Sequence, residues 1–174
     1  MAKKKAANRR RKKKYTSDDL QIIDDLDFIR THPEMNLSRT VPDPAMIASD
    51  IALDAITLGA TDVRIFKFQD WWIVNADKDW LNAPCRRSVS PTEAFQTYLP
   101  FPELGVNTIH HEILATAFAQ AVVSLSATDR FVVQGNIVDD DPVWQKMQCE
   151  NVSRSVALRM DGAGKASTMP KTDG

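Results

Sequence analysis

The stretch DPAMIASDIALDAITLGATDVRIFKFQDWWIV, residues 43–74, contains the clearest secondary-structure signals of the chain. Asp43 is suited to the N-cap and Pro44 to the first helical position, so we expect a helix to begin here. Its apolar residues recur at helical spacing on one face, at Ile47, Ile51, Ala55 and Leu58. Gly59 then indicates the end of the helix. Both ends of this helix are therefore predicted from local sequence.

A β-hairpin is predicted directly after this helix. Residues 62–68 carry apolar side chains on both faces of a strand, and residues 71–74 follow across a turn at Gln69 and Asp70. The tryptophans at positions 71 and 72 point to opposite faces of their strand. An exposed tryptophan here would indicate a surface for a protein partner, whereas packing beneath a loop is the simpler interpretation.

Further elements are predicted on both sides of this stretch. Capping-box patterns at residues 16–19 and 90–93 predict the starts of two helices. The first continues until Pro33, and the second continues to about Tyr98 and ends before Pro100. A wide apolar stripe predicts a longer helix. Two more strand regions are predicted towards the end of the chain. These three elements span residues 108–125, 130–137 and 143–160.

The predicted order of elements is α, α, β, β, α, α, β, β. It favours an α+β fold, a two-layer sandwich in which the helices lie on one face of a mostly antiparallel sheet. A composition of 43% hydrophobic and 26% charged residues allows such a domain to bury a core. We expect one domain over residues 16–160, a disordered basic tail at 1–15 and a second disordered tail at 161–174.

The net charge of −1 conceals an uneven distribution. Nine of the 22 Lys and Arg residues, and no acid, lie within residues 1–14, so the rest carries 13 basic and 23 acidic residues, a net charge of about −10. Such an arm can bind DNA or another polyanion by neutralising phosphates. The alternatives are a solubilising tail, a localisation signal, or an arm folded against the acidic body. The candidate nucleic-acid-binding residues are Lys3, Lys4, Lys5, Arg9, Arg10, Arg11, Lys12, Lys13 and Lys14.

The same sequence features exclude several classes of protein. No run approaches eighteen consecutive apolar residues, so no membrane span is expected. The first fourteen residues are charged and are unlike a secretory signal, so we expect a cytoplasmic protein. Cys85 and Cys149 lie far apart, which predicts two reduced structural cysteines rather than a disulfide or a cysteine-zinc site.

The segment LDFIRTHPEMNL, residues 26–37, resembles the N-terminal segment of the ATPase subunits of the bacterial type II topoisomerases, gyrase and topoisomerase IV. The residues that match the family pattern are Leu26, Arg30, Pro33 and Met35. Conservative replacements stand at Ile29 and Leu37, and the order of elements over about residues 17–160 is similar as well. The resemblance implies the ATP-binding fold shared by gyrase, heat-shock chaperones, histidine kinases and MutL, known as the GHKL fold.

The resemblance also implies roles for two residues of the helix after Asp43. In the family, this helix presents a glutamate that activates the attacking water and, four residues later, an asparagine that binds magnesium. The aligned residues here are Met46 and Asp50. Methionine cannot act as a general base, so hydrolysis by the family's mechanism is not expected. Asp50 is a candidate magnesium ligand, and the alternative for a lone acid on a helix is a solvent-facing side chain.

Two glycine-containing motifs of the family are altered in this chain. The segment aligned with Asp-x-Gly-x-Gly is NADKDWL, residues 75–81. In it, Asp77 is the candidate adenine contact and Asn75 the alternative in a shifted register, and either can instead be a turn residue at a strand end. The segment aligned with the phosphate loop, residues 103–112, contains Gly105 as its one glycine, together with two acids. Phosphate would therefore meet side chains and negative charge there.

His110 and His111 are the remaining candidates for a chemical site. Adjacent residues on a helix point about 100° apart, so these two cannot both bind one metal ion in the manner of an i, i+4 pair. No third ligand stands at a recognisable spacing, so no metal site is predicted at these two histidines.

We therefore predict a non-catalytic or strongly degenerate GHKL-like binding protein that requires no cofactor and associates with DNA through its basic arm. The alternative is a divergent ATP-binding protein or ATPase. In that case Asp50 would hold magnesium, and ATP would contact Asp77 or Asn75 together with Gly105.

Overall fold

The computed structural model describes residues 23–37, 41–84 and 89–160. The two predicted tails, the nine basic residues of the arm, the start of the first predicted helix and Cys85 lie outside the described residues. The helices are α1 (Asp25–Thr31), α2 (Pro33–Asn36), α3 (Pro44–Thr57), α4 (Glu112–Phe118) and α5 (Pro142–Met147). The strands are β1 (Val63–Phe68), β2 (Trp71–Ala76), β3 (Ala121–Ser126), β4 (Arg130–Gln134) and β5 (Arg154–Arg159).

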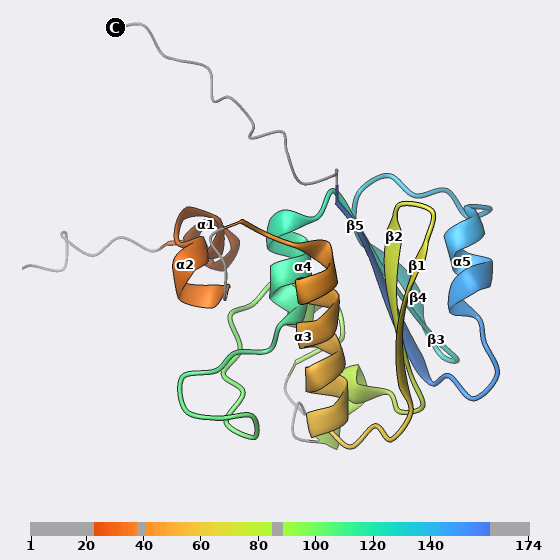
Figure 1. Cartoon of the computed structure of the whole chain (residues 1–174), viewed down its shortest axis with the longest axis horizontal. Helices are drawn as coiled ribbons and strands as arrows, with labels where there is room; N and C mark the ends of the chain where they lie inside the picture. Colours follow the sequence, from red (N-terminus) through yellow and green to blue (C-terminus); the bar gives the residue numbers. More distant parts are fainter. Residues whose placement is uncertain (1–22, 38–40, 85–88, 161–174) are drawn as a thin grey trace, which may run out of the picture.

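The five strands form one open sheet in the order β1-β2-β5-β3-β4. Every neighbouring pair is antiparallel, and β5, the last of these strands in the sequence, lies at the centre. Helices α3 and α4 lie side by side over one face of the sheet (Figure 1). This arrangement confirms the predicted α+β class, with an antiparallel sheet and a layer of helices.

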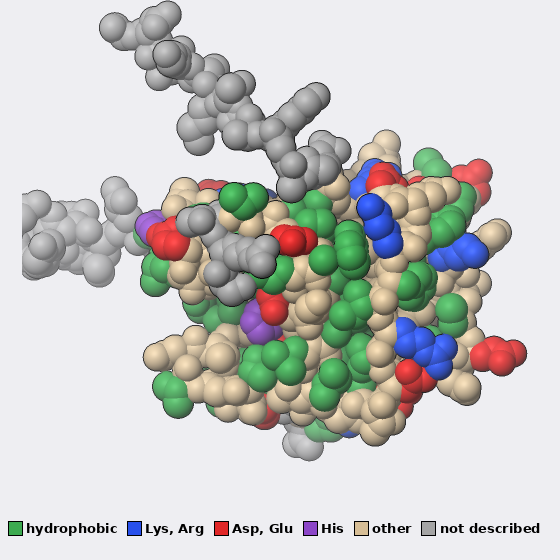
Figure 2. Space-filling view, viewed as in Figure 1, with side chains coloured by type: hydrophobic (Ala, Val, Ile, Leu, Met, Phe, Trp, Pro, Cys, Tyr) green, Lys and Arg blue, Asp and Glu red, His purple; other side chains and the backbone are tan. Residues whose placement is uncertain are grey.

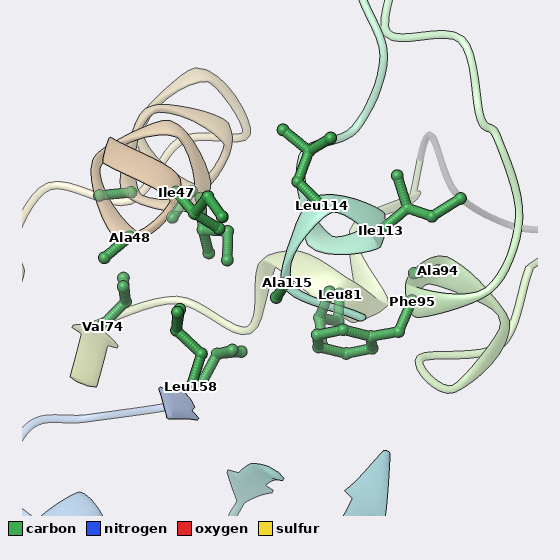
Figure 3. Close-up of a cluster of buried hydrophobic side chains, with 14 of the residues drawn as sticks. Ile47, Ala48, Val74, Leu81, Ala94, Phe95, Ile113, Leu114, Ala115 and Leu158 are labelled. Carbon is green, nitrogen blue, oxygen red and sulfur yellow. The ribbon is translucent and has the colours of Figure 1, made fainter. Parts of the chain in front are cut away.

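The main hydrophobic core lies between the sheet and this helix layer. Ile47 from α3 and Leu114 from α4 are fully buried in one cluster with Val74 and Leu158 from the two neighbouring strands β2 and β5 (Figure 3). Phe95, from the segment between β2 and α4, closes the same core. The core therefore joins elements from most of the described sequence.

The opposite face of the sheet carries a second, smaller core beneath α5 (Figure 1). Trp144 and Met147 of α5 pack there with Trp71 and Ala157. Trp72, on the other face of its strand, packs against the main core. The tryptophan pair is therefore part of the domain packing, but beneath helix α5 and against the main core rather than beneath a loop.

The predicted helix and hairpin within residues 43–74 are confirmed. The Asp43 carboxylate accepts a hydrogen bond from the Ala45 backbone N–H at 2.9 Å, as expected of an N-cap. Gly59 follows the helix with a φ of 93°, in the left-handed region that glycine tolerates. The hairpin closes with Phe68 opposite Trp71.

The single long helix predicted for residues 108–125 is wrong. Helix α4 ends at Phe118, and strand β3 begins at Ala121. Val122 faces the main core and Val123 faces the second core, so this strand is covered on both sides. A strand buried on both faces has a continuous apolar run, which periodicity cannot distinguish from a buried helix.

Three other predicted elements differ from those in the structure. The capping box at residues 90–93 is present, since the Ser90 N–H donates to Glu93 Oε2 at 2.8 Å, but only a 3₁₀ turn follows it, Glu93–Phe95. The region 143–160 contains α5 before β5, because Asp141 caps a helix that begins at Pro142. In the part of the chain that the structure describes, the first helix begins after Asp24, whose carboxylate accepts from the Leu26 N–H at 3.0 Å.

Candidate functional site

A buried cluster of ionisable side chains lies between α3 and the start of α4. Asp54 comes from α3, on the face that also buries Ile47 and Ile51. His110, His111 and Glu112 come from the chain as it enters α4. Asp54 and Glu112 are fully buried and His110 is 5% exposed. We call these four residues, Asp54, His110, His111 and Glu112, the buried acid–histidine cluster.

Asp54 connects the two helices of the cluster. Its carboxylate accepts a hydrogen bond from the His111 backbone N–H at 2.6 Å and pairs with His111 Nδ1 at 2.7 Å. His110 Nδ1 lies 3.8 Å from Asp54 Oδ2. A carboxylate thus occupies the N-terminal end of α4, where backbone N–H groups are otherwise left without helical partners.

The electrostatics of this pair favour a carboxylate and an imidazolium. Burial opposes the charged form of Asp54, but hydrogen bonds from His110 and His111 outweigh it and keep the pKa of Asp54 below its ordinary value. Burial likewise disfavours a charged His111, and the hydrogen bond and negative charge of Asp54 reverse this and raise the pKa of His111. Each partner therefore favours the charged form of the other across the 2.7 Å contact.

Two aromatic side chains hold the other members of the cluster. The Trp80 indole N–H donates to Glu112 Oε1 at 2.7 Å, within the buried interior. The ring of Phe101 stacks on the ring of His110, with 4.0 Å between centroids and 19° between planes. Both contacts restrict the orientation of side chains that carry ligand or proton-transfer atoms.

Asp50, the candidate magnesium ligand, lies at the edge of the cluster. It precedes Asp54 by about one helical turn and is half-buried. Burial raises the pKa of Asp50, His111 opposes this effect, and the charge of Asp54 adds to it. Met46, one further turn towards the start of α3, packs against the main core.

Asn75 and Asp77, the adenine-contact candidates, are held by structural hydrogen bonds. Asn75 is buried on the α5 side of the sheet, where its Oδ1 accepts from the Ser155 hydroxyl at 2.7 Å. Its side chain therefore points away from Asp50 and α3. The carboxylate of Asp77 accepts from the N–H and the hydroxyl of Thr61, at 2.9 and 2.5 Å. Asp77 thereby fixes the loop between α3 and β1.

Gly105 lies in the loop that leads to α4, where it lines a pocket of about 480 Å³. Most of the wall is apolar, with Val106 exposed and Phe101 buried between the pocket and His110. The structure thus places Asp50 beside the acid–histidine cluster, Gly105 in a separate loop pocket, and Asn75 on the opposite face of the sheet.

The sequence interpretation overlooked the grouping of Asp54 with His110 and Glu112. One signal was present: Asp54 stands between Ile51 and Leu58 on the face of the predicted helix that is otherwise apolar. An acid at such a position requires a buried partner. The identity of that partner could not be read from spacing, because His111 is 57 residues away in the sequence.

In the view of Figure 2, histidine side chains lie beside acidic side chains on the helix-covered side, and most visible Lys and Arg side chains lie on the side of the sheet and α5. Among the described residues, no helix is long and apolar enough to cross a membrane.

No protein-family model matches this chain, and a search of curated proteins gives no significant match.

Proposed function

We propose that this chain is a non-catalytic binding protein, built on a degenerate form of the GHKL fold and associated with DNA through its basic N-terminal arm in the cytoplasm. The observation that carries the non-catalytic part is the contact between Asp54 and His111. In the family that residues 26–37 resemble, the loop before the helix that corresponds to α4 receives the phosphates of ATP. Here, the buried Asp54 carboxylate accepts the hydrogen bond of the N–H of His111, the residue that directly precedes α4.

The surrounding charge supports the same proposal. Asp50, Asp54 and Glu112 lie around the start of α4, and the His111 side chain is already paired with Asp54. A triphosphate placed there would be repelled by carboxylates in a region of low dielectric constant. The residue aligned with the family's general base is Met46, which cannot accept a proton from water.

Calorimetry with magnesium and ATP on the intact protein tests this part. We expect no micromolar binding and no release of phosphate. The alternative is a divergent ATPase with magnesium at Asp50. In that case the protein hydrolyses ATP, Asp50→Asn abolishes the hydrolysis, and Asp77→Ala weakens the binding of ATP. Micromolar affinity for ATP with that dependence on Asp77 would refute the non-catalytic proposal. Ser49→Ala, an exposed neighbour on α3, is the matched control.

The DNA-binding part of the proposal depends on residues 1–14. Each phosphate that the arm neutralises contributes about −0.9 to the slope of log affinity against log salt concentration, so nine basic residues set the upper limit. The binding is expected to be nearly independent of DNA sequence, because phosphate contacts carry no sequence information. Removal of the arm leaves a body with a net charge of about −10, which repels DNA.

Fluorescence anisotropy with a labelled duplex, at two salt concentrations, compares the intact protein with a form lacking residues 1–14. We expect a slope of several units for the intact protein and no binding by the truncated form. Equal affinity of the two forms, or a slope near zero, would rule out the arm as a DNA contact. If the arm instead folds against the acidic body, the truncated form loses thermal stability.

A further inference from the structure

We propose that Asp54, His110 and Glu112 form a binding site for a divalent first-row transition-metal ion, with zinc as the ion to test. Each residue offers one ligand atom, and the three atoms lie within 4.8 Å of one another. All three residues are buried, in a part of the molecule where side chains are held by packing. This inference does not depend on the proposed function.

The distances are compatible with one ion. Zinc binds histidine nitrogen and carboxylate oxygen at about 2.0 to 2.2 Å, so two atoms on the same ion are roughly 3 to 4 Å apart. Because the three atoms lie within 4.8 Å of one another, the side chains need to close by at most about 1 to 2 Å. His110 Nδ1 already lies 3.8 Å from Asp54 Oδ2.

The donor atoms select the class of metal. One imidazole nitrogen with two carboxylate oxygens suits zinc, iron(II), manganese or cobalt. Magnesium and calcium prefer sites made of oxygen ligands alone, and magnesium retains several waters. The two carboxylates also favour a dication electrostatically in this buried cluster.

Each candidate ligand has an orienting partner, as metal ligands in proteins usually do. Trp80 donates to Glu112 Oε1 and so fixes the direction of that carboxylate. His111 bonds both oxygens of Asp54, and a carboxylate oxygen has a second lone pair for coordination. Phe101 holds the plane of His110 by stacking. His111, whose side chain is 16% exposed, is the most exposed of the four residues of the cluster.

Titration of the full-length protein with zinc, by calorimetry and by thermal unfolding, tests the proposal. The protein carries Cys85→Ser and Cys149→Ser, so that thiols do not contribute. We expect one ion per chain and a raised unfolding temperature, because a ligand that binds only the folded state stabilises it. His110→Asn and Glu112→Gln are each expected to weaken binding at least about tenfold. His32→Asn, at an exposed histidine of α1's C-cap, is the matched control and leaves affinity unchanged.

His111 acts as a positioning residue in this site. His111→Asn is expected to weaken zinc binding about tenfold and to retain the stoichiometry of one ion, because it disturbs the orientation of Asp54 without removing a ligand. Circular dichroism establishes that each variant is folded. If His110→Asn does not fold, the visible spectrum of cobalt added to the intact protein tests the site instead. Strong bands of a four- or five-coordinate ion support the site, and the weak spectrum of hydrated cobalt overturns it. Absence of saturable zinc binding, undiminished affinity in His110→Asn and Glu112→Gln, or a preference for magnesium also overturns it.

Discussion

Arg154 shows how a single side chain can join distant parts of this fold. It is fully buried in the central strand β5, and its guanidinium bonds both oxygens of Asp79, each at 2.8 Å. It also bonds both oxygens of Asp129, at 2.5 and 3.0 Å. The planar guanidinium can satisfy two carboxylates at once, which lysine cannot do. Arg154 thus connects β5 to the turn after β2 and to the turn between β3 and β4.

Replacement of Arg154 by leucine should lower the free energy of unfolding by about 3 kcal/mol, because it leaves two partly buried carboxylates without their cation. Chemical denaturation measures this change. Arg64→Leu is the matched control: Arg64 forms an exposed ion pair with Asp62, and such pairs contribute about 1 kcal/mol or less. Equal effects of the two substitutions would contradict the role assigned to Arg154.

The same network predicts loss of stability in acid. Burial opposes ionisation of Asp129, but hydrogen bonds and the positive charge of Arg154 outweigh it, so the pKa of Asp129 in the folded protein is below its ordinary value. A carboxyl with a lowered pKa stabilises the fold above its unfolded pKa of about 4, and this contribution disappears as the pH falls through the folded pKa.

Thermal unfolding between about pH 5 and pH 2 tests this prediction. We expect Asp129→Asn to be less stable than the wild type at pH 5 and to lose less further stability in acid. Asp139→Asn is the control, since Asp139 pairs with Arg130 but is fully exposed. Parallel pH profiles for the wild type and Asp129→Asn would exclude a contribution from this carboxyl.

The junction between α4 and β3 depends on close packing against the end of β4. Gly135 follows β4 with a φ of 91°. A Cβ atom at Gly135 would lie 2.9 Å from both the Gln120 carbonyl oxygen and Ala121 Cβ. These atoms belong to the chain that enters β3, so they cannot move without shifting the strand.

Gly135→Ala should therefore destabilise the protein more than Gly59→Ala does. Both glycines have a positive φ, which costs alanine about 1 kcal/mol. A Cβ at Gly59 meets only the flexible end of Lys78, at 2.7 Å. A Cβ at Gly135 meets backbone, and this clash lowers the free energy of unfolding by about 2 kcal/mol more. Denaturant titrations of the two variants give the difference, and equal destabilisation would contradict the packing argument.

The order of the sheet makes folding depend on the last strand. Strand β5 pairs with β2 on one side and with β3 on the other, so without it the sheet consists of two separate hairpins. Five of its six residues are buried. A two-stranded hairpin is at best marginally stable in water, so neither half is expected to persist alone.

A chain that ends at residue 160 should therefore unfold cooperatively near the temperature of the full-length protein, whereas a chain that ends at residue 153 should show no cooperative transition. Circular dichroism on heating and size-exclusion chromatography distinguish these outcomes. A cooperative transition in the shorter chain would show that the central position of β5 is not essential to the fold.

Helix α3 and the β1–β2 hairpin could be predicted from the sequence because their signals are local. The cap at Asp43, the helix end at Gly59 and the turn after Phe68 each depend on residues a few positions apart. The α+β class followed from the order of such elements, and the structure confirms it. The uneven charge of the chain is also a property of sequence alone.

Other features required the tertiary structure because they depend on residues that are distant in the sequence. Residues 121–125 form a strand because both of their faces are covered, by the main core and by the core beneath α5. The position of β5 between β2 and β3 follows from long-range pairing. The grouping of Asp54 with His110 and Glu112 arises because α3 and α4 pack on the same face of the sheet. No local pattern encodes that proximity: it is produced by burial of two apolar helix faces, which brings together the polar side chains that those faces carry.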